Sequence, residues 1–300
     1  MGICISIKNS KTQTIISQID KNKKKEEEVN KEYVFAPDDT AIGHIPDDKQ
    51  EYITKQAEKS VCKILINKKG KGSGFGTGFL CNIGEHFKIK ALVTAYHVLG
   101  KEELNEGNEI KITFNNNKKT KIIKIDNSRQ IYANINDDIT IIEILKKDKL
   151  DNYEPLEIDE SIYNNNMDLF NVYKDKIIYI IHYPEGNLVK FDKNIIINID
   201  KNNDIYHLCS TLGGSSGAPI LNLDTLKVIR IHLGYSNYEK NIFNNEIINK
   251  FEHLFNNENK IKCNFGKTIK DSINRFNKPN KIILTLKIDK YEINIKKYIL

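Results

Sequence analysis

Three side chains that together could carry out acyl transfer are spread along this chain. Ser216 stands in the glycine-rich segment GGSSGAP, His97 follows the apolar run ALVTA, and Asp138 precedes the apolar run ITIIEI. A serine hydroxyl is a poor nucleophile at neutral pH and needs a base to take its proton. Histidine can be that base, and a carboxylate can fix the imidazole tautomer and stabilise the imidazolium. The residue types therefore predict a nucleophile, a base and an orienting acid.

Each of these residues also has a simpler interpretation. A bend rich in glycine and serine can be only a turn, and an aspartate at the start of a strand is a common turn residue. A single histidine beside a strand is more often structural than catalytic. Asp137 is an alternative to Asp138 as the acid. The catalytic interpretation rests on the three residues taken together.

The elements around these residues indicate an all-β protein. Ile, Val, Thr, Tyr and Phe recur in short alternating runs that Asn, Asp, Gly and Lys interrupt, which is typical of strands and turns. Strands are expected at residues 60–66, 79–81, 91–95, 110–114, 122–125, 139–144, 176–182, 188–191, 195–199, 205–208, 218–221 and 228–233. Helical periodicity over residues 238–255 predicts a C-terminal helix.

The motifs TAYH, DDIT and GSSGAP, which contain His97, Asp138 and Ser216, resemble the three signatures of the chymotrypsin-like (trypsin-fold) serine peptidases. A GTGF strand before the histidine and the strand IRIHLG after the serine extend the resemblance. It implies two packed antiparallel β-barrels and a catalytic triad of these three residues. It also implies serine endopeptidase activity through an acyl-enzyme, with the backbone N–H groups of Gly214 and Ser216 as the oxyanion hole.

The resemblance is closest to the bacterial-type glutamyl-endopeptidase branch. Ser210 occupies the position where trypsin-like members carry an aspartate, so cleavage after Lys or Arg is disfavoured. Thr211 and His232 match the hydroxyl and imidazole that hold an acidic side chain in this branch, although the alignment needs one extra residue before His232. The resemblance therefore implies a preference for Glu before the cut. His182 and His207 are expected to be structural.

The resemblance covers residues 52 to 256 and implies the domain organisation. The first barrel is expected at about 52–145 and the second at about 155–256. The polar composition of residues 1–51 predicts a flexible segment. In the extension 257–300, residues 282–288 and 293–295 alternate as a short appended β hairpin or as the start of a partner-binding module. The sequence leaves the role of this extension open.

The N-terminus carries an acylation pattern. Gly2 and Ser6 match the myristoylation motif, and Cys4 stands where a palmitoyl group is often added. A single myristoyl chain binds a membrane only marginally, so Cys4 or the basic run at 21–25 would supply the second signal. A chance match in a flexible tail is the alternative. We expect membrane association through N-terminal acylation.

Composition indicates an intracellular protein that is not secreted. Five cysteines are few for a disulfide scaffold, and an odd number cannot all pair with one another. Extracellular relatives often join a cysteine at the Cys81 position to one just after the histidine, and here that position is Val98. No run is long and apolar enough to span a bilayer, and no secretory signal is evident. We expect the cytoplasm or the inner face of a membrane.

Other classes of function have little support. The net charge of +6 is spread along the chain, so no nucleic-acid partner is expected. The glycines at 72–78 lack the spacing of a phosphate loop, and no cluster of residues has metal-ligand spacing, so neither a cofactor nor a metal is expected. Protein or peptide substrates are expected. The alternative function is a catalytically silent scaffold or binding protein on the same fold.

Overall fold

The computed structural model describes residues 45–68, 72–83, 89–115, 119–164, 168–174, 176–200, 202–243, 245–256, 258–277, 283–288 and 291–296. All of them belong to one compact unit, Ala36–Leu300. The predicted acylation residues Gly2 and Cys4 lie outside the described residues. None of the described helices is long and apolar enough to cross a bilayer.

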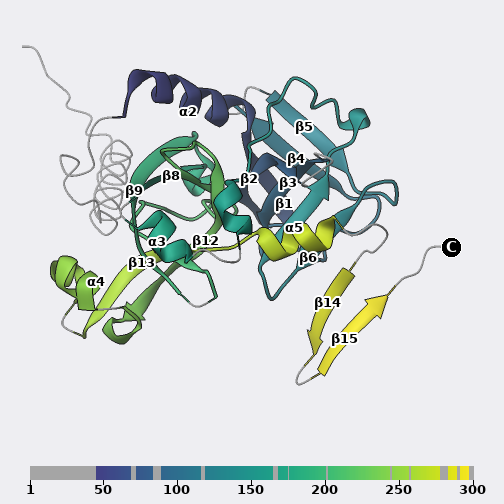
Figure 1. The fold of residues 1–300 in the computed structure, drawn as a ribbon. Coiled ribbons are helices and arrows are strands. Elements are labelled where there is room, and N and C mark those ends of the chain that lie inside the picture. The colour runs from purple at the N-terminus through teal and green to yellow at the C-terminus, as the bar shows by residue number, and fades with distance from the viewer. Residues whose placement is uncertain are drawn as a thin grey trace, which may run out of the picture. The chain divides into compact units, whose positions relative to one another are not determined.

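A nine-stranded sheet forms the first half, with β15 contributed by the C-terminus (Figure 1). Its strand order is β15-β14-β6-β7-β3-β2-β1-β4-β5. The strands from the first half of the chain are β1 Val61–Lys68, β2 Gly72–Ile83, β3 Ile89–Ala95, β4 Glu109–Phe114, β5 Lys119–Lys124, β6 Ile131–Asn134 and β7 Ile139–Glu143. Alternation explains their placement, since β4 buries Ile110, Ile112 and Phe114 and exposes Glu109 and Lys111.

A closed six-stranded barrel forms the second half, in the order β10-β13-β12-β11-β8-β9. Its strands are β8 Ile177–His182, β9 Lys190–Ile199, β10 Ile205–His207, β11 Pro219–Asn222, β12 Val228–Glu239 and β13 Lys260–Lys267. The predicted all-β class is confirmed, and the second half is the expected antiparallel barrel. The first half differs from the expectation in being an open sheet, because β5 and β6 are not neighbours in its strand order.

The second barrel ends later than predicted. β13 pairs with β12 on one side and β10 on the other, so it closes the barrel from beyond residue 256. This strand lies beyond the expected domain end at 256. The signatures that carry the resemblance end before this strand, so the sequence does not distinguish it from the extension, although its residues Ile261 and Cys263 are buried.

The helices differ most from the prediction. β12 extends to Glu239, and the region after it holds only the short helix α4 Asn245–Lys250, between the 3-10 turns η5 Lys240–Ile242 and η6 Glu252–Leu254. Phe243, Ile247 and Phe251 pack in one apolar cluster at helical spacing. This spacing produced the helical periodicity, although the predicted helix 238–255 is not formed as a whole.

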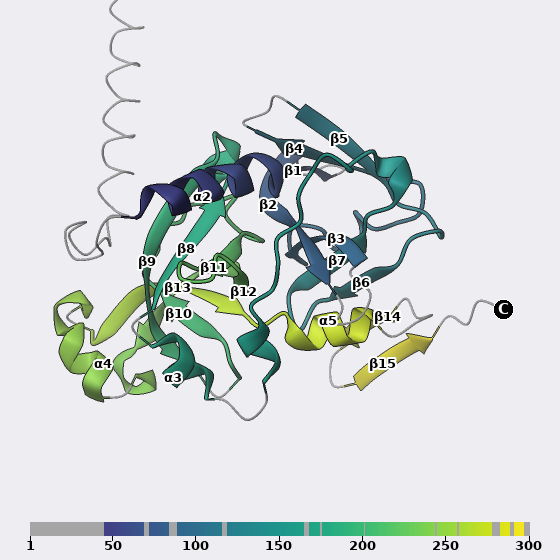
Figure 2. The ribbon, with the colours of Figure 1, turned by 45° about the horizontal axis from the view of Figure 1, so that its top comes forward.

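Helix α5 Lys270–Phe276 follows the barrel and returns the chain to the first sheet, beside β6 (Figure 2). The hairpin of β14 Ile283–Ile288 and β15 Tyr291–Lys296 then extends that sheet through a parallel pairing of β14 with β6. The predicted appended hairpin is confirmed. The shorter elements are α3 Leu169–Tyr173, η2 Lys146–Asp148, η3 Glu160–Tyr163 and η4 Pro184–Gly186.

Helix α2 Asp47–Lys59 begins before Tyr52, where ordered structure was expected. Asp47 and Asp48 in its first turn and Lys59 in its last complement the helix dipole. Gln56 anchors the helix to the second barrel, since its amide donates to the Leu226 carbonyl at 2.9 Å and accepts from the Tyr179 hydroxyl at 2.7 Å. The buried face of α2 contains the polar Gln56, so the sequence lacks the continuous apolar stripe that would predict this helix.

Candidate active site

The structure brings His97 and Asp138 together. His97 follows the last residue of β3 by two positions, and Asp138 directly precedes β7, which pairs with β3. Nδ1 of His97 lies 2.7 Å from Oδ2 of Asp138, and the His97 backbone N–H donates to Oδ1 at 2.9 Å. A carboxylate oxygen accepts, so Nδ1 carries the proton and Nε2 is left as an acceptor. The His97 side chain is 47% exposed, so this nitrogen can meet a substrate.

Backbone contacts hold Asp138 in an uncommon conformation. Its φ of 53° is left-handed, which aspartate tolerates better than most residues. Its carbonyl accepts a hydrogen bond from the Tyr96 N–H at 3.0 Å. Both its carboxylate and its backbone are thus bound to the loop that carries His97.

Asp137 has different partners. Its carboxylate accepts from the Tyr132 hydroxyl at 3.0 Å and lies 3.6 Å from Nη1 of Arg275 on α5. Ser272 on the same helix is 3.5 Å away. Asp137 therefore joins α5 to the first sheet, and the geometry favours Asp138 as the partner of His97.

Ser216 lies on a bend that only glycine can form. Gly214 and Gly217 have φ of 89° and 86°, in the left-handed region. A Cβ at Gly217 would overlap the Thr77 carbonyl oxygen and the Thr94 hydroxyl, and would lie 3.0 Å from the Ala95 nitrogen. The Ser216 bend is therefore packed against the strand end that precedes His97.

The Ser216 hydroxyl donates to the Leu233 carbonyl at 3.2 Å in this structure, and among the described residues no hydrogen bond joins it to His97. The Ser216 side chain is partly exposed. The N–H groups of Gly214 and Ser216 have no acceptor among the described residues. Backbone N–H groups without an acceptor near a partly exposed serine are the kind of donor that an oxyanion hole uses.

Ser215 also pairs with a histidine, but this pair is enclosed. Its hydroxyl lies 2.7 Å from Nδ1 of His182, and both residues are buried. Burial, together with Lys190, lowers the pKa of His182 to about 3, so the imidazole is neutral. Ser215 has no access for a substrate, and the pair fastens the bend to β8.

The predicted pocket residues lie at the start of the same bend and on β12. The Thr211 hydroxyl donates to Oδ1 of Asn264 on β13, and the Ser210 N–H donates to the Asp192 carboxylate at 2.6 Å. Sequence analysis missed both Asn264 and Asp192, which lie in segments that carry no motif. They reach this place only because the barrel closes.

Three buried histidines line the interior of the second barrel. His207 and His232 meet edge to face with ring centroids 5.5 Å apart, and His182 is near enough to lower the pKa of both. Burial is the larger cause, and it lowers the pKa of His207 to about 3 and that of His232 well below its usual value. Nε2 of His207 and Nδ1 of His232 have no described partner.

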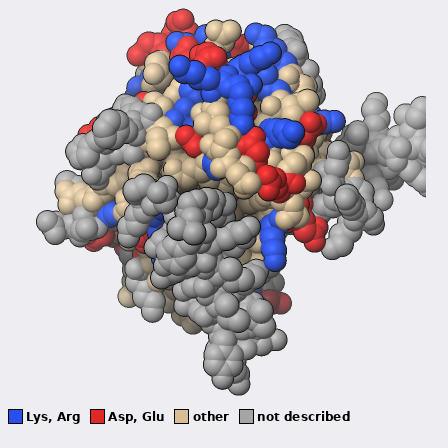
Figure 3. All heavy atoms as spheres, turned by 90° about the vertical axis from the view of Figure 1, so that its right-hand side faces the viewer, with Lys and Arg blue, Asp and Glu red and all other residues tan. Residues whose placement is uncertain are grey.

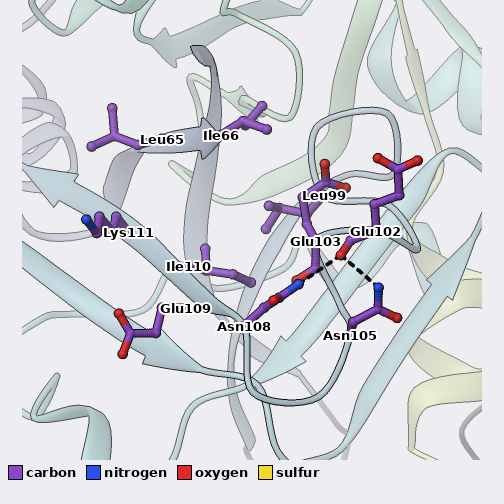
Figure 4. Close-up of a pocket in the computed structure, with 10 residues that line it drawn as sticks. All are labelled: Leu65, Ile66, Leu99, Glu102, Glu103, Asn105, Asn108, Glu109, Ile110 and Lys111. Atoms are coloured by element: carbon purple, nitrogen blue, oxygen red, sulfur yellow. Dashed lines mark hydrogen bonds between the residues drawn. The ribbon is translucent and has the colours of Figure 1, made fainter. Parts of the chain in front are cut away.

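A cavity of about 650 Å³ lies beside the loop that follows His97 (Figure 4). Leu65, Ile66, Leu99 and Ile110 form apolar walls, and Glu102, Glu103 and Glu109 line it with carboxylates. Asn108 closes the loop by donating to the Glu102 and Glu103 carbonyls. Among the described residues, those of this cavity included, no group of three His, Cys, Asp or Glu side chains is arranged to hold a metal ion.

All four described cysteines, Cys62, Cys81, Cys209 and Cys263, are buried free thiols. Cys81 therefore has no disulfide, as the valine at position 98 implied. Burial raises the pKa of the Cys81 thiol, which keeps it protonated.

Comparison with solved structures agrees with this fold. A serine endoprotease from Yersinia pestis is similar over 80% of this chain and 70% of its own, with 14% identity and a TM-score of 0.50. The active form of the Rv3671c protease from M. tuberculosis has 14% identity and a TM-score of 0.47 over 77% of this chain and 87% of its own. No curated protein matches the chain in sequence.

A sequence model of the trypsin-like peptidase domain matches residues 76–229, just over half of the chain. The matched region runs from the strand before His97 to β12 and includes Asp138 and Ser216. Together with the all-β architecture and the coupled His97–Asp138 pair, this match shows that the chain belongs to the family of trypsin-like peptidases.

Proposed function

We propose that this protein is a serine endopeptidase with His97, Asp138 and Ser216 as its catalytic triad. The observation that carries the proposal is the pair of hydrogen bonds from His97 to the Asp138 carboxylate, which leaves Nε2 without a partner among the described residues. The Ser216 bend packs against the strand end that precedes His97. The two unpaired N–H groups of that bend support it.

In the proposed reaction, the Ser216 hydroxyl leaves the Leu233 carbonyl and turns to His97. Nε2 takes its proton as Oγ attacks the peptide carbonyl, while Asp138 stabilises the imidazolium. The N–H groups of Gly214 and Ser216 bind the oxyanion, and each such donor stabilises the transition state by about 3 kcal/mol. His97 then protonates the leaving amine. Water, activated by the same base, hydrolyses the acyl-enzyme.

Hydrolysis of fluorogenic peptides tests this proposal. Ser216→Ala should reduce kcat by about a millionfold, because the nucleophile is lost. Ser236→Ala is the matched control, because Ser236 is an exposed serine on β12. This variant should keep full activity. A folded wild-type protein that hydrolyses no peptide would favour the catalytically silent scaffold.

We further propose that the residue before the cut is Glu. His232 is the donor that supports this choice, while the Thr211 hydroxyl already donates to Asn264. The Asp192 carboxylate beside Ser210 favours the opposite charge. A peptide set that differs only at the residue before the cut decides between an acidic and a basic preference. Rates led by Glu, and lowered at least tenfold by His232→Gln, support the proposal, and rates led by Lys or Arg contradict it.

We also propose that the protein acts inside the cell at a membrane, anchored by acylation of Gly2 and Cys4. A basic face supports this proposal. The exposed or half-exposed lysines around edge strand β5 are Lys111, Lys119, Lys121, Lys124, Lys146, Lys147 and Lys149. Figure 3 shows lysine and arginine side chains gathered on the upper part of this face. Each lysine near an anionic bilayer contributes about 1 kcal/mol.

Binding of the myristoylated protein to vesicles tests the anchor. Binding should rise with the fraction of anionic lipid and fall with salt. Gly2→Ala should abolish most of it, and Lys119→Glu combined with Lys124→Glu should weaken it. Equal binding by the Gly2→Ala variant would contradict the proposal.

A further inference from the structure

Lys63 is a buried lysine without a described counter-charge. It lies near the start of β1, its residue is 7% exposed, and no described carboxylate is paired with it. The only described contact of its ammonium group is with the Gly186 carbonyl, which accepts a hydrogen bond from Nζ at 2.8 Å. Burying an ammonium group without an acid is unfavourable. Its presence therefore points to a role for this one bond.

The bond joins the two halves of the molecule. Lys63 belongs to the first sheet, whereas Gly186 ends the turn η4 that follows β8 of the second barrel. Gly186 has φ of 66°, and its N–H donates to the Tyr183 carbonyl at 3.1 Å to close the turn. Lys63 thus holds the free carbonyl at the end of this turn.

The η4 turn supports the Ser216 bend. The Glu185 N–H donates to the Gly213 carbonyl. A Cβ at Gly214 would lie 2.7 Å from the Tyr183 carbonyl oxygen and 3.2 Å from the nitrogens of Glu185 and Gly186. The backbone of the turn therefore lies directly against Gly213 and Gly214.

Thr77 completes the connection. Its hydroxyl donates to the Gly214 carbonyl at 2.8 Å and accepts from the Tyr183 N–H at 3.0 Å. Thr77 is on β2, which pairs with β1 so that Lys63 and Thr77 are direct partners. The two peptides that flank Gly214 are therefore held by two cross-strand neighbours. Thr77 binds the Gly214 carbonyl directly, and Lys63 acts on the Gly213 carbonyl through the turn.

We propose that Lys63 is a positioning residue that fixes the turn at 183–186 and, through it, the backbone donors of the Ser216 bend. The inference rests on the proposed peptidase function. Lys63 does not touch the reacting atoms. Because the oxyanion exists only in the transition state, loss of this positioning should lower kcat and leave KM nearly unchanged.

The test compares Lys63→Met, which keeps the length and apolar stem, with Lys63→Arg, which keeps the donor. Lys90→Met is the matched control, because Lys90 also donates to backbone carbonyls, those of Leu150 and Tyr153, but away from the turn. We expect Lys63→Met to lower kcat at least tenfold with KM within twofold. Lys63→Arg should recover most of the loss, and Lys90→Met should leave kcat unchanged.

Hydrogen exchange measured on the same variants makes the inference independent of activity. Lys63→Met should speed amide exchange in residues 183–187 and 212–217, and Lys90→Met should not. Unchanged exchange there, or a kcat within twofold of wild type, would overturn the inference. If the wild type has no turnover, the proposed function fails, and the exchange result alone then decides whether Lys63 holds the bend.

Discussion

At the scale of single residues, two neighbouring aspartates have separate tasks. Asp138 binds His97 through both carboxylate oxygens, whereas Asp137 contacts Tyr132 and Arg275. Because the two side chains are chemically identical, their positions in the fold decide which of them contacts His97. The left-handed backbone of Asp138 turns its side chain toward His97.

Asp138→Asn should lower kcat about ten-thousandfold, because an amide can donate to Nδ1 and leave the proton on the wrong nitrogen. Asp137→Asn should keep kcat within about threefold of the wild-type value, because Asp137 contacts no proposed catalytic group. Steady-state kinetics of the two variants check this. Equal losses in both would contradict the assignment of the acid.

Gly217 offers a test of the bend itself. Gly217→Ala should lower the free energy of unfolding by at least about 3 kcal/mol, because it combines a left-handed φ with overlap against backbone oxygen. Gly213→Ala is the control, since a Cβ there meets nothing within 4 Å. Denaturant unfolding of both variants measures the difference. A Gly217→Ala protein as stable as Gly213→Ala would contradict the described packing.

At the scale of elements, strand positions could be predicted because alternation of apolar and polar residues survives in most of them. β8 and β11 were found as apolar runs, and the three signatures fell at the ends of strands. Strands β6 and β13 were not predicted, because β6 has only two large apolar residues, Ile131 and Tyr132, and β13 lies beyond the region that the resemblance covers. The long predicted helix failed because three aromatic and aliphatic residues at helical spacing also suit a series of short turns.

The buried histidines make the second barrel sensitive to acid. The folded pKa of His207 is about 3, below its unfolded value of about 6.5, so the unfolded chain binds more protons between these values. Stability is therefore lost as pH falls below about 6.5. Each such histidine contributes a slope of about 1.4 kcal/mol per pH unit.

His207→Gln should reduce the slope of unfolding free energy against pH between 6.5 and 4.5 by about that amount. His253→Gln, at an exposed histidine on η6, is the matched substitution for comparison. Urea unfolding at several pH values measures both. An unaltered slope for His207→Gln would show that His207 is not held neutral.

At the scale of the whole molecule, the candidate site depends on contacts between distant segments. The proposed triad could be chosen from motifs, since each motif is local. Asp192, Asn264 and Lys63 could not, because their importance arises only when the barrel closes and the two halves meet. Helix α5 similarly reaches Asp137 only after the chain returns to the first sheet.

The central claim is that Ser216, activated by His97, is the nucleophile, and labelling with a fluorophosphonate followed by peptide mass spectrometry tests it most directly. The neighbouring Ser215 is an internal control, because it is buried and bound to His182. The account predicts one adduct, on Ser216, that disappears in both Ser216→Ala and His97→Ala. An adduct on Ser215, or a folded wild-type protein that takes up no label, would contradict it.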